Sequence, residues 1–273
     1  MSKNGNKIRN IIVCIMLSLL LVNNNVSLFA KSTVDIYTNK LDKGVIGIKC
    51  DNDTNKRMKV VIQKGNNKYT YDINNQYEQF PLQMGNGNYT VTCYKNVSGK
   101  SYAMIKQKKV NLNLSNTKTV YLNSIQPIEW ETNNESIKFA NNLTNKVPKE
   151  YSKIITLHKH MVETGYVYDT NKISRVPITY TPDIEDTYKN KSGICYDFSS
   201  LFGAMLRSQG IPTKLVKGYA KGIKTYHAWN EVYDSTKKEW LVVDTTYDIE
   251  YNKVKVKVNM VKKDSDYQKV KEY

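Results

Sequence analysis

The stretch KSGICYDFSSLFGAMLRSQGIP, residues 191–212, combines a turn, a single cysteine and a helical pattern. Gly193 predicts a sharp turn just before Cys195. The apolar residues that follow recur at offsets of 0, 3, 4, 7 and 8, which is the spacing of one helix face. They are Phe198, Leu201, Phe202, Met205 and Leu206. Because Gly210 and Pro212 end the pattern, we expect a helix that begins at Cys195.

A position at the start of a helix bears on the reactivity of Cys195. A helix N-terminus presents unpaired N–H groups and a partial positive charge. Such surroundings favour the nucleophilic thiolate form of a cysteine, and the same N–H groups can stabilise an oxyanion. Cys195 is therefore a candidate nucleophile. A packed apolar residue, half of a disulfide and a zinc ligand are the alternatives.

The other cysteines narrow these alternatives. Cys14 lies in the N-terminal leader, so three of the four cysteines remain, and an odd number suggests a free thiol. Cys50 and Cys93 lie in similar strand-like runs and could face each other, but the sequence leaves open whether they form a disulfide. The chain has no CxxC or HxxxH pair, which disfavours zinc.

A histidine and an aspartate follow Cys195 in strand-like segments. Residues 211–220, 225–234 and 238–247 predict an antiparallel sheet. His227 lies in the second segment, and Asp244 follows the apolar run WLVV in the third. A carboxylate at the end of a buried strand needs a partner. Adjacent strands joined by a short turn would supply it, giving Cys195 the base and the orienting group that a thiol nucleophile requires.

Three blocks together resemble the transglutaminase-like superfamily of cysteine enzymes: GICYD at 193–197, HAWNEV at 227–232 and WLVVDTT at 240–246. The resemblance covers about residues 150–250 and shares the order Cys–His–Asp with papain-like enzymes. It implies that Cys195 attacks an amide or peptide carbonyl, that His227 transfers the proton and that Asp244 holds the imidazole. The superfamily contains crosslinking enzymes, proteases, deamidases and domains without known activity, so the fold does not choose among them.

The resemblance also implies a polar or aromatic side chain, upstream of the cysteine, that assists the oxyanion. Four tyrosines are the candidates: Tyr166, Tyr168, Tyr180 and Tyr188. We expect the substrate cleft to be lined by Tyr168, Tyr180, Tyr188 and Trp229. Asp197 has the position of a first-turn acid that complements the helix dipole, so its expected role is structural. We expect no cofactor and no metal, calcium included.

The rest of the chain predicts two domains. Residues 31–125 contain short runs rich in Val, Ile, Tyr and Thr between turn signals, which favours an all-β immunoglobulin-like sandwich. Two helical patterns follow, the first ended by Pro148 and the second by Gly165. A basic alternating run at 253–261 predicts a further strand. Residues 126–273 therefore read as an α+β catalytic domain.

The N-terminus has the pattern of a secretory signal peptide, residues 1–30. A basic head precedes an apolar run at 11–22, and Ala30 offers a small residue at the exit. The apolar run has 12 residues, whereas a membrane span needs about 20. We therefore expect cleavage after Ala30, no transmembrane anchor afterwards, and a secreted or cell-surface protein of bacterial type.

The net charge is +16, and it remains +13 once the three positive residues of the leader are removed. This surplus suits anionic surface polymers, lipid headgroups or acidic proteins rather than a specific nucleic acid, although a solvated lysine-rich surface would give the same count. The expected function is a secreted thiol acyl-transfer enzyme acting on protein or peptide substrates, cell-wall peptides included. The alternative is a non-enzymatic cell-wall scaffold with the same fold.

Overall fold

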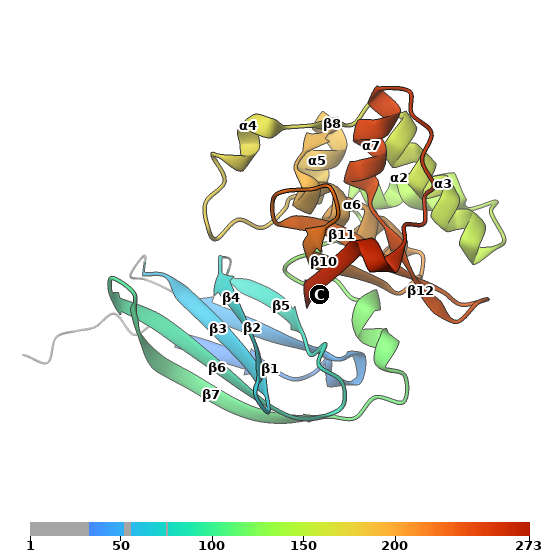
Figure 1. The fold of residues 1–273 in the computed structure, drawn as a ribbon. Helices are drawn as coiled ribbons and strands as arrows, with labels where there is room; N and C mark the ends of the chain where they lie inside the picture. The colour runs from blue at the N-terminus through green and yellow to red at the C-terminus, as the bar shows by residue number, and fades with distance from the viewer. Residues whose placement is uncertain (1–32, 52–55, 75) are drawn as a thin grey trace, which may run out of the picture.

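The computed structural model describes residues 33–51, 56–74 and 76–273. A β-sandwich forms the N-terminal part, and a unit of helices around a sheet forms the C-terminal part (Figure 1). The leader at 1–30 lies outside the described residues, so the signal peptide stays a prediction. Within the described ranges, no helix has the length and apolarity needed to cross a membrane.

The N-terminal part consists of two antiparallel sheets, ordered β1-β2-β5 and β4-β3-β6-β7. Side chains from both sheets meet in one apolar core, because alternate strand positions point inward. An all-β fold is therefore confirmed here, while the relation to immunoglobulin domains stays a prediction. The strands are β1 (Thr33–Tyr37), β2 (Val45–Asp51), β3 (Met58–Lys64), β4 (Asn67–Ile73), β5 (Tyr77–Pro81), β6 (Gly87–Ser98) and β7 (Ser101–Leu112).

Two of the cysteines lie inside this sandwich. Cys50 and Cys93 are both buried and both free, so the disulfide that the sequence left open is not formed. Burial, together with the neighbouring Cys50, raises the pKa of Cys93 to about 12. Burial also raises the pKa of Cys50. Both thiols therefore stay protonated and poorly nucleophilic at neutral pH.

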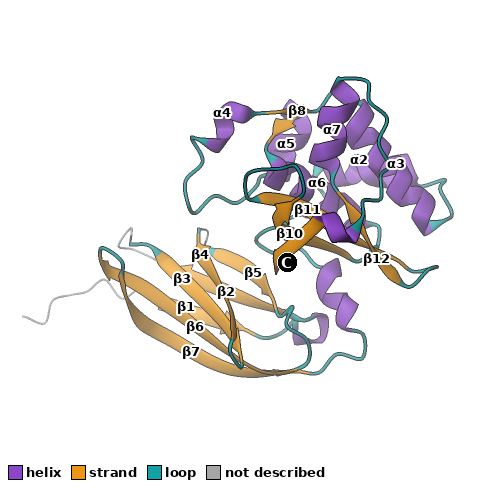
Figure 2. Ribbon diagram, in the orientation of Figure 1, coloured by secondary structure: helices purple, strands orange, loops and turns teal. Residues whose placement is uncertain are grey.

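The C-terminal part is built around helix α6 (Cys195–Ser208), which packs against a four-stranded antiparallel sheet of order β12-β11-β10-β13. Every apolar position predicted for its inner face is fully buried. Figure 2 shows the helices gathered together on the sheet. The strands are β10 (Thr213–Ala220), β11 (His227–Asp234), β12 (Glu239–Val243) and β13 (Tyr267–Glu272). The other helices are α2 (Glu135–Thr144), α3 (Glu150–Glu163), α4 (Thr170–Ile173), α5 (Ile184–Asn190) and α7 (Thr245–Lys253).

The strand predicted at 253–261 is wrong. Helix α7 runs to Lys253, Lys255 has a positive φ of 59°, and Val261 forms one isolated bridge to Val243. The edge of the sheet beside β10 is occupied by β13 instead. Val254 is accordingly 66 % exposed.

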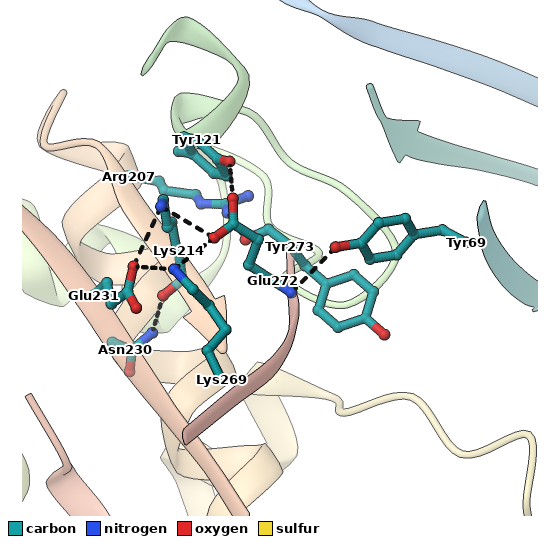
Figure 3. A network of polar contacts seen from close by, with 9 residues as sticks. All are labelled: Tyr69, Tyr121, Arg207, Lys214, Asn230, Glu231, Lys269, Glu272 and Tyr273. Atoms are coloured by element: carbon teal, nitrogen blue, oxygen red, sulfur yellow. Dashed lines mark hydrogen bonds and ion pairs between the residues drawn. The ribbon is translucent and has the colours of Figure 1, made fainter. Parts of the chain in front are cut away.

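A polar network joins the C-terminal strand to both parts of the chain (Figure 3). The Glu272 carboxylate of β13 lies 2.8 Å from Lys269 Nζ and 3.1 Å from Lys214 Nζ. It also accepts a hydrogen bond from the Tyr121 hydroxyl. The main-chain N–H of Glu272 donates to the Tyr69 hydroxyl of the sandwich, at 3.4 Å. These contacts hold β13 between the sandwich and β10.

We expect Glu272→Gln to lower the free energy of unfolding by about 2 kcal/mol at neutral pH. The substitution removes the negative charge that Lys214 and Lys269 bind. Burial alone would raise the pKa of Glu272, but hydrogen bonds from Lys269 and Tyr121 and the charge of Lys214 outweigh it and lower the pKa. A lowered folded pKa stabilises the fold above the ordinary value of 4.5, and this contribution is lost as the pH falls through the folded value.

Urea unfolding of both proteins at pH 7 and at pH 3.5, about one unit below the ordinary carboxyl value, measures this effect. The difference between wild type and variant should narrow at the lower pH. Glu239→Gln removes an exposed ion pair with Lys237 and is expected to change little. Equal stability of wild type and Glu272→Gln at pH 7 would contradict the role given to the network.

Candidate active site

The turn before α6 positions Cys195 as the first residue of the helix. The short parallel pair β8 (Val167–Tyr168) and β9 (Ser192–Gly193) leads into this turn. Gly193 has no room for a side chain, since a Cβ there would lie 2.7 Å from the Cβ of Asp197. Cys195 lies at the helix N-terminus, as the sequence pattern predicts, and the residue is partly exposed.

Asp197 fastens this turn. Its carboxylate is fully buried and accepts a hydrogen bond from the Ile194 N–H at 2.8 Å. Lys172 Nζ lies 2.8 Å from the same carboxylate, and the Tyr180 hydroxyl donates to it. Because these partners neutralise its charge, Asp197 supports the helix start without repelling a thiolate at Cys195, in line with its expected structural role.

His227 and Asp244 meet because β11 and β12 are paired. His227 begins β11 and Asp244 directly follows β12, with Asn230 opposite Val243 in the register. His227 Nε2 lies 2.8 Å from Asp244 Oδ2. Cys195 is also among the groups that raise the pKa of His227, which places its sulfur close to the imidazole. Cys195, His227 and Asp244, which are far apart in the sequence, are thus brought together.

The Asp244 carboxylate is fixed by several hydrogen bonds. It is fully buried, and besides the imidazole it accepts hydrogen bonds from the Tyr267 hydroxyl and from the Tyr247 N–H, both at 3.0 Å. The second of these bonds caps helix α7, which starts at Thr245 rather than continuing the predicted strand. The carboxylate therefore has a fixed direction, and so has the imidazole that it binds.

The electrostatics of the site favour a charged imidazole. Burial alone would lower the pKa of His227, but the hydrogen bonds to Asp244 and Cys195 and the charges of both groups outweigh it. The pKa of His227 is raised to about 10. His227 therefore carries its proton at neutral pH when Cys195 is a thiolate, which is the arrangement of an activated cysteine nucleophile.

Tyr168 is the upstream tyrosine that the structure brings to Cys195. Cys195 is among the groups that shift the pKa of Tyr168, which places the hydroxyl close to Cys195. Burial, and then the charge of Cys195, raise the pKa of Tyr168, so its hydroxyl stays protonated and able to donate. Together with the N–H groups at the start of α6, it can stabilise an oxyanion formed next to the sulfur.

The other expected cleft residues lie elsewhere. Tyr180 points its hydroxyl at Asp197. Tyr188 packs its ring on Phe139, with centroids 5.6 Å apart. Trp229 is only 1 % exposed and its ring lies 6.3 Å from that of His227, so it backs the imidazole rather than lining an open cleft.

Two residues near the site were not predicted from the sequence. Tyr267, which binds Asp244, lies in the polar strand β13, whose sequence YQKVKE carries no strong strand signal. Lys217 of β10 lies beside Cys195, whose negative charge acts on its pKa. A lysine in a strand is ordinarily taken as solvent-facing, so no signal marked it. Among the described residues, no group of three or more His, Cys, Asp or Glu side chains could hold a metal ion.

Comparison with known proteins gives a match in sequence. Residues 137–245 match the family model described as the transglutaminase-like superfamily. The uncharacterized protein YebA of Bacillus subtilis (strain 168) is 23 % identical over 177 residues, which cover 59 % of this chain. The chain spans 23 % of the length of that relative.

Three solved structures match at low sequence identity, each with a TM-score under 0.5. A candidate cysteine protease from Cytophaga hutchinsonii has a TM-score of 0.46 at 15 % identity and covers 81 % of this chain and 82 % of its own. The periplasmic domain of TgpA from Pseudomonas aeruginosa, bound to ethylmercury, has a TM-score of 0.41 at 14 % identity, with coverages of 73 % and 92 %. Red sea bream transglutaminase has a TM-score of 0.35 at 10 % identity, with coverages of 79 % and 53 %.

Proposed function

Residues 137–245 belong to the transglutaminase-like superfamily, and from this premise we propose that the chain is a secreted cysteine enzyme that transfers acyl groups from amide or peptide carbonyls. The observation that carries the proposal is the arrangement of Cys195, His227 and Asp244. His227 Nε2 lies 2.8 Å from the buried Asp244 carboxylate, and Cys195 is close enough to act on the pKa of the same imidazole. This is the geometry that nucleophilic thiol catalysis requires.

The first half of the reaction forms a thioester. The Cys195 thiolate attacks the carbonyl carbon, and the new C–S bond places negative charge on the carbonyl oxygen. Tyr168 and the N–H groups at the start of α6 stabilise that oxyanion. As the oxyanion collapses, the C–N bond breaks, and His227 gives its proton to the leaving ammonia or amine. Asp244 keeps the imidazole in the orientation that this transfer needs.

The second half releases the acyl group. Water or a primary amine attacks the thioester, and neutral His227 takes the proton that the attacking group loses. The C–S bond then breaks and restores the thiolate beside the imidazolium. Water gives deamidation or peptide cleavage, whereas an amine such as a lysine gives a crosslink.

We expect Tyr168→Phe to lower kcat by about 10- to 100-fold with little change in KM, because its hydroxyl acts on charge that develops in the transition state. Steady-state kinetics on a Cys195-dependent substrate measure this. Tyr166→Phe is the matched control, because the Tyr166 hydroxyl is buried without a partner among the described residues. Equal loss in both variants, or none in Tyr168→Phe, would contradict the role of Tyr168.

The leader and the charge supply the setting. The signal-like residues 1–30 support export, and protein or peptide substrates outside the cell, cell-wall peptides among them, follow as the proposed class. The basic surplus would hold the enzyme near anionic wall polymers. In this proposal an immunoglobulin-like sandwich at 31–125 acts as the spacer or binding module, and 126–273 acts as the catalytic domain.

Mass spectrometry of peptides, proteins and cell-wall fragments incubated with the enzyme tests the proposal. Each sample is run with and without an added primary amine, and with enzyme pretreated with iodoacetamide as the inactivated control. Exchange of ammonia for water, a cleaved peptide or an amine adduct would identify the acyl acceptor. No product above the inactivated control, together with unchanged binding to cell walls, would favour the scaffold alternative.

A further inference from the structure

Lys217 lies next to the candidate nucleophile but outside the catalytic arrangement. It stands in β10 beside Gly218, which pairs with His227 across the sheet. Its Nζ lies 3.3 Å from the centroid of the Tyr196 ring, and Tyr196 directly follows Cys195. It also lies 5.6 Å from the centroid of the Tyr273 ring. The ammonium is thus held between two aromatic faces at the edge of the site.

Lys217 differs from the other lysines of this sheet. Lys214 and Lys269 each form ion pairs with Glu231 and Glu272. In the part of the chain that the structure describes, Lys217 forms no ion pair with a carboxylate. Its ammonium group contacts the rings of Tyr196 and Tyr273 instead. Burial lowers the pKa of Lys217 to about 8, and the charge of Cys195 opposes this effect. Lys217 is half-buried. Covering a cation without an anion costs free energy, which an anion arriving from outside would offset.

The other charged groups around the site have partners within the protein. His227 is compensated by Asp244, and Asp197 by Lys172. Lys271 lies opposite Lys217 in the register, but its Nζ donates to the Lys68 carbonyl. When Cys195 is deprotonated, its sulfur is therefore the anion left close to Lys217 among the residues that the structure describes.

Formation of the acyl-enzyme removes this anion. A thioester carries no charge, so Lys217 would lose its one nearby negative group as soon as Cys195 is acylated. An acyl group that itself carries a negative charge would restore the balance at that moment.

We propose that Lys217, with the rings of Tyr196 and Tyr273, forms an anion subsite for the acyl donor, which bears a carboxylate close to the carbonyl that Cys195 attacks. Figure 3 shows Tyr273 at the end of β13 near Tyr69 of the sandwich. The ring centroids of Tyr69 and Tyr273 are 5.6 Å apart, so the sandwich supports one wall of this subsite. The inference rests on the proposed function and names the substrate class of the same site.

Alkylation by a charged and a neutral reagent tests the subsite without a known substrate. Iodoacetate and iodoacetamide both form an S–C bond with the thiolate and release iodide, but only iodoacetate carries a carboxylate. At pH 7, below the pKa of Lys217, we expect Lys217→Met to lower the iodoacetate to iodoacetamide rate ratio about five- to tenfold. Peptide mass spectrometry of Cys195 gives both rates.

Three controls accompany this comparison. Lys217→Arg keeps the charge and should keep the ratio. Lys221→Met removes an exposed lysine, with the same change in net charge, and should also keep the ratio. In the wild type the ratio should fall between pH 7 and pH 9, as Lys217 loses its proton, while His227 with a pKa of about 10 stays largely charged.

The outcomes separate the two proposals. If Lys217→Met slows both reagents equally, Lys217 supports the thiolate itself and the anion subsite is refuted, as it is by an unchanged ratio. If Cys195 reacts with neither reagent in the wild type, the proposed function itself fails.

A second arm identifies the source of the carboxylate. Chloroacetyl derivatives of glutamic α-amide, of free glutamine and of glutamine α-amide carry a side-chain carboxylate, a main-chain carboxylate and none. If Lys217 favours the glutamic α-amide derivative, the substrate carboxylate belongs to an acidic side chain. If Lys217 favours the derivative of free glutamine, the carboxylate belongs to a chain terminus. Equal labelling of Cys195 by all three would overturn the proposal.

Discussion

Cys195→Ala is expected to lower acyl transfer by about 10⁴-fold or more, to the background rate, because no other group at the site can form the thioester. The partly exposed thiol is replaced by a smaller apolar group at a helix start, so folding should be preserved. Mass spectrometry of a substrate found with the wild type, followed over time, measures the loss.

The matched control for this variant is Cys50→Ala. It removes another free cysteine, one that is buried in the sandwich core, and it should change stability rather than turnover. Turnover by Cys195→Ala at more than a hundredth of the wild-type rate would show that the chemistry lies elsewhere.

His227→Gln is expected to lower kcat/KM by about 10³-fold, since it removes the group that donates and accepts the proton. The charged imidazole that stabilises the thiolate is lost as well. The rate of Cys195 alkylation in the variant should therefore climb with pH through the range in which an ordinary thiol ionises, about 8.5. In the wild type the rate should climb less steeply over the same range, because His227, with a pKa of about 10, stays charged beside the sulfur.

The chain offers a close control for this change. His158 Nε2 lies 2.8 Å from Asp248 Oδ2, a second buried His–Asp pair one turn further along α7. His158→Gln makes the same substitution away from Cys195, so it should lower stability and leave the pH profile of alkylation unchanged. A profile altered equally in both variants would indicate a general effect on folding rather than a base at His227.

The helix that carries the nucleophile was predictable in detail. Its apolar spacing, the glycine turn before it and the Gly210 stop each follow from local rules, and the apolar face from Phe198 onward is buried throughout. The meeting of His227 and Asp244 was predictable for the same reason, because a short turn between two strands leaves few other pairings.

Residues that depend on distant parts of the chain were not predictable. Strand β13 pairs with β10 although about fifty residues of sequence separate them. The alternation at 253–261 is more regular, and it therefore predicted a strand in the wrong segment. Tyr168 reaches Cys195 through a two-residue parallel pairing, which is too short to leave a periodic signal. Lys217 is partly covered by the rings of Tyr273 and Tyr196, and nothing in its own strand indicates those contacts.

The reactivity of Cys195 relative to the other thiols tests the central claim most directly. Native protein without its leader is treated with iodoacetamide at pH 7, and peptide mass spectrometry follows each cysteine over time. We predict that Cys195 is alkylated at least about 100-fold faster than Cys50 and Cys93, which burial keeps protonated. Labelling of Cys195 no faster than that of Cys50 or Cys93 would contradict the assignment of Cys195 as the nucleophile.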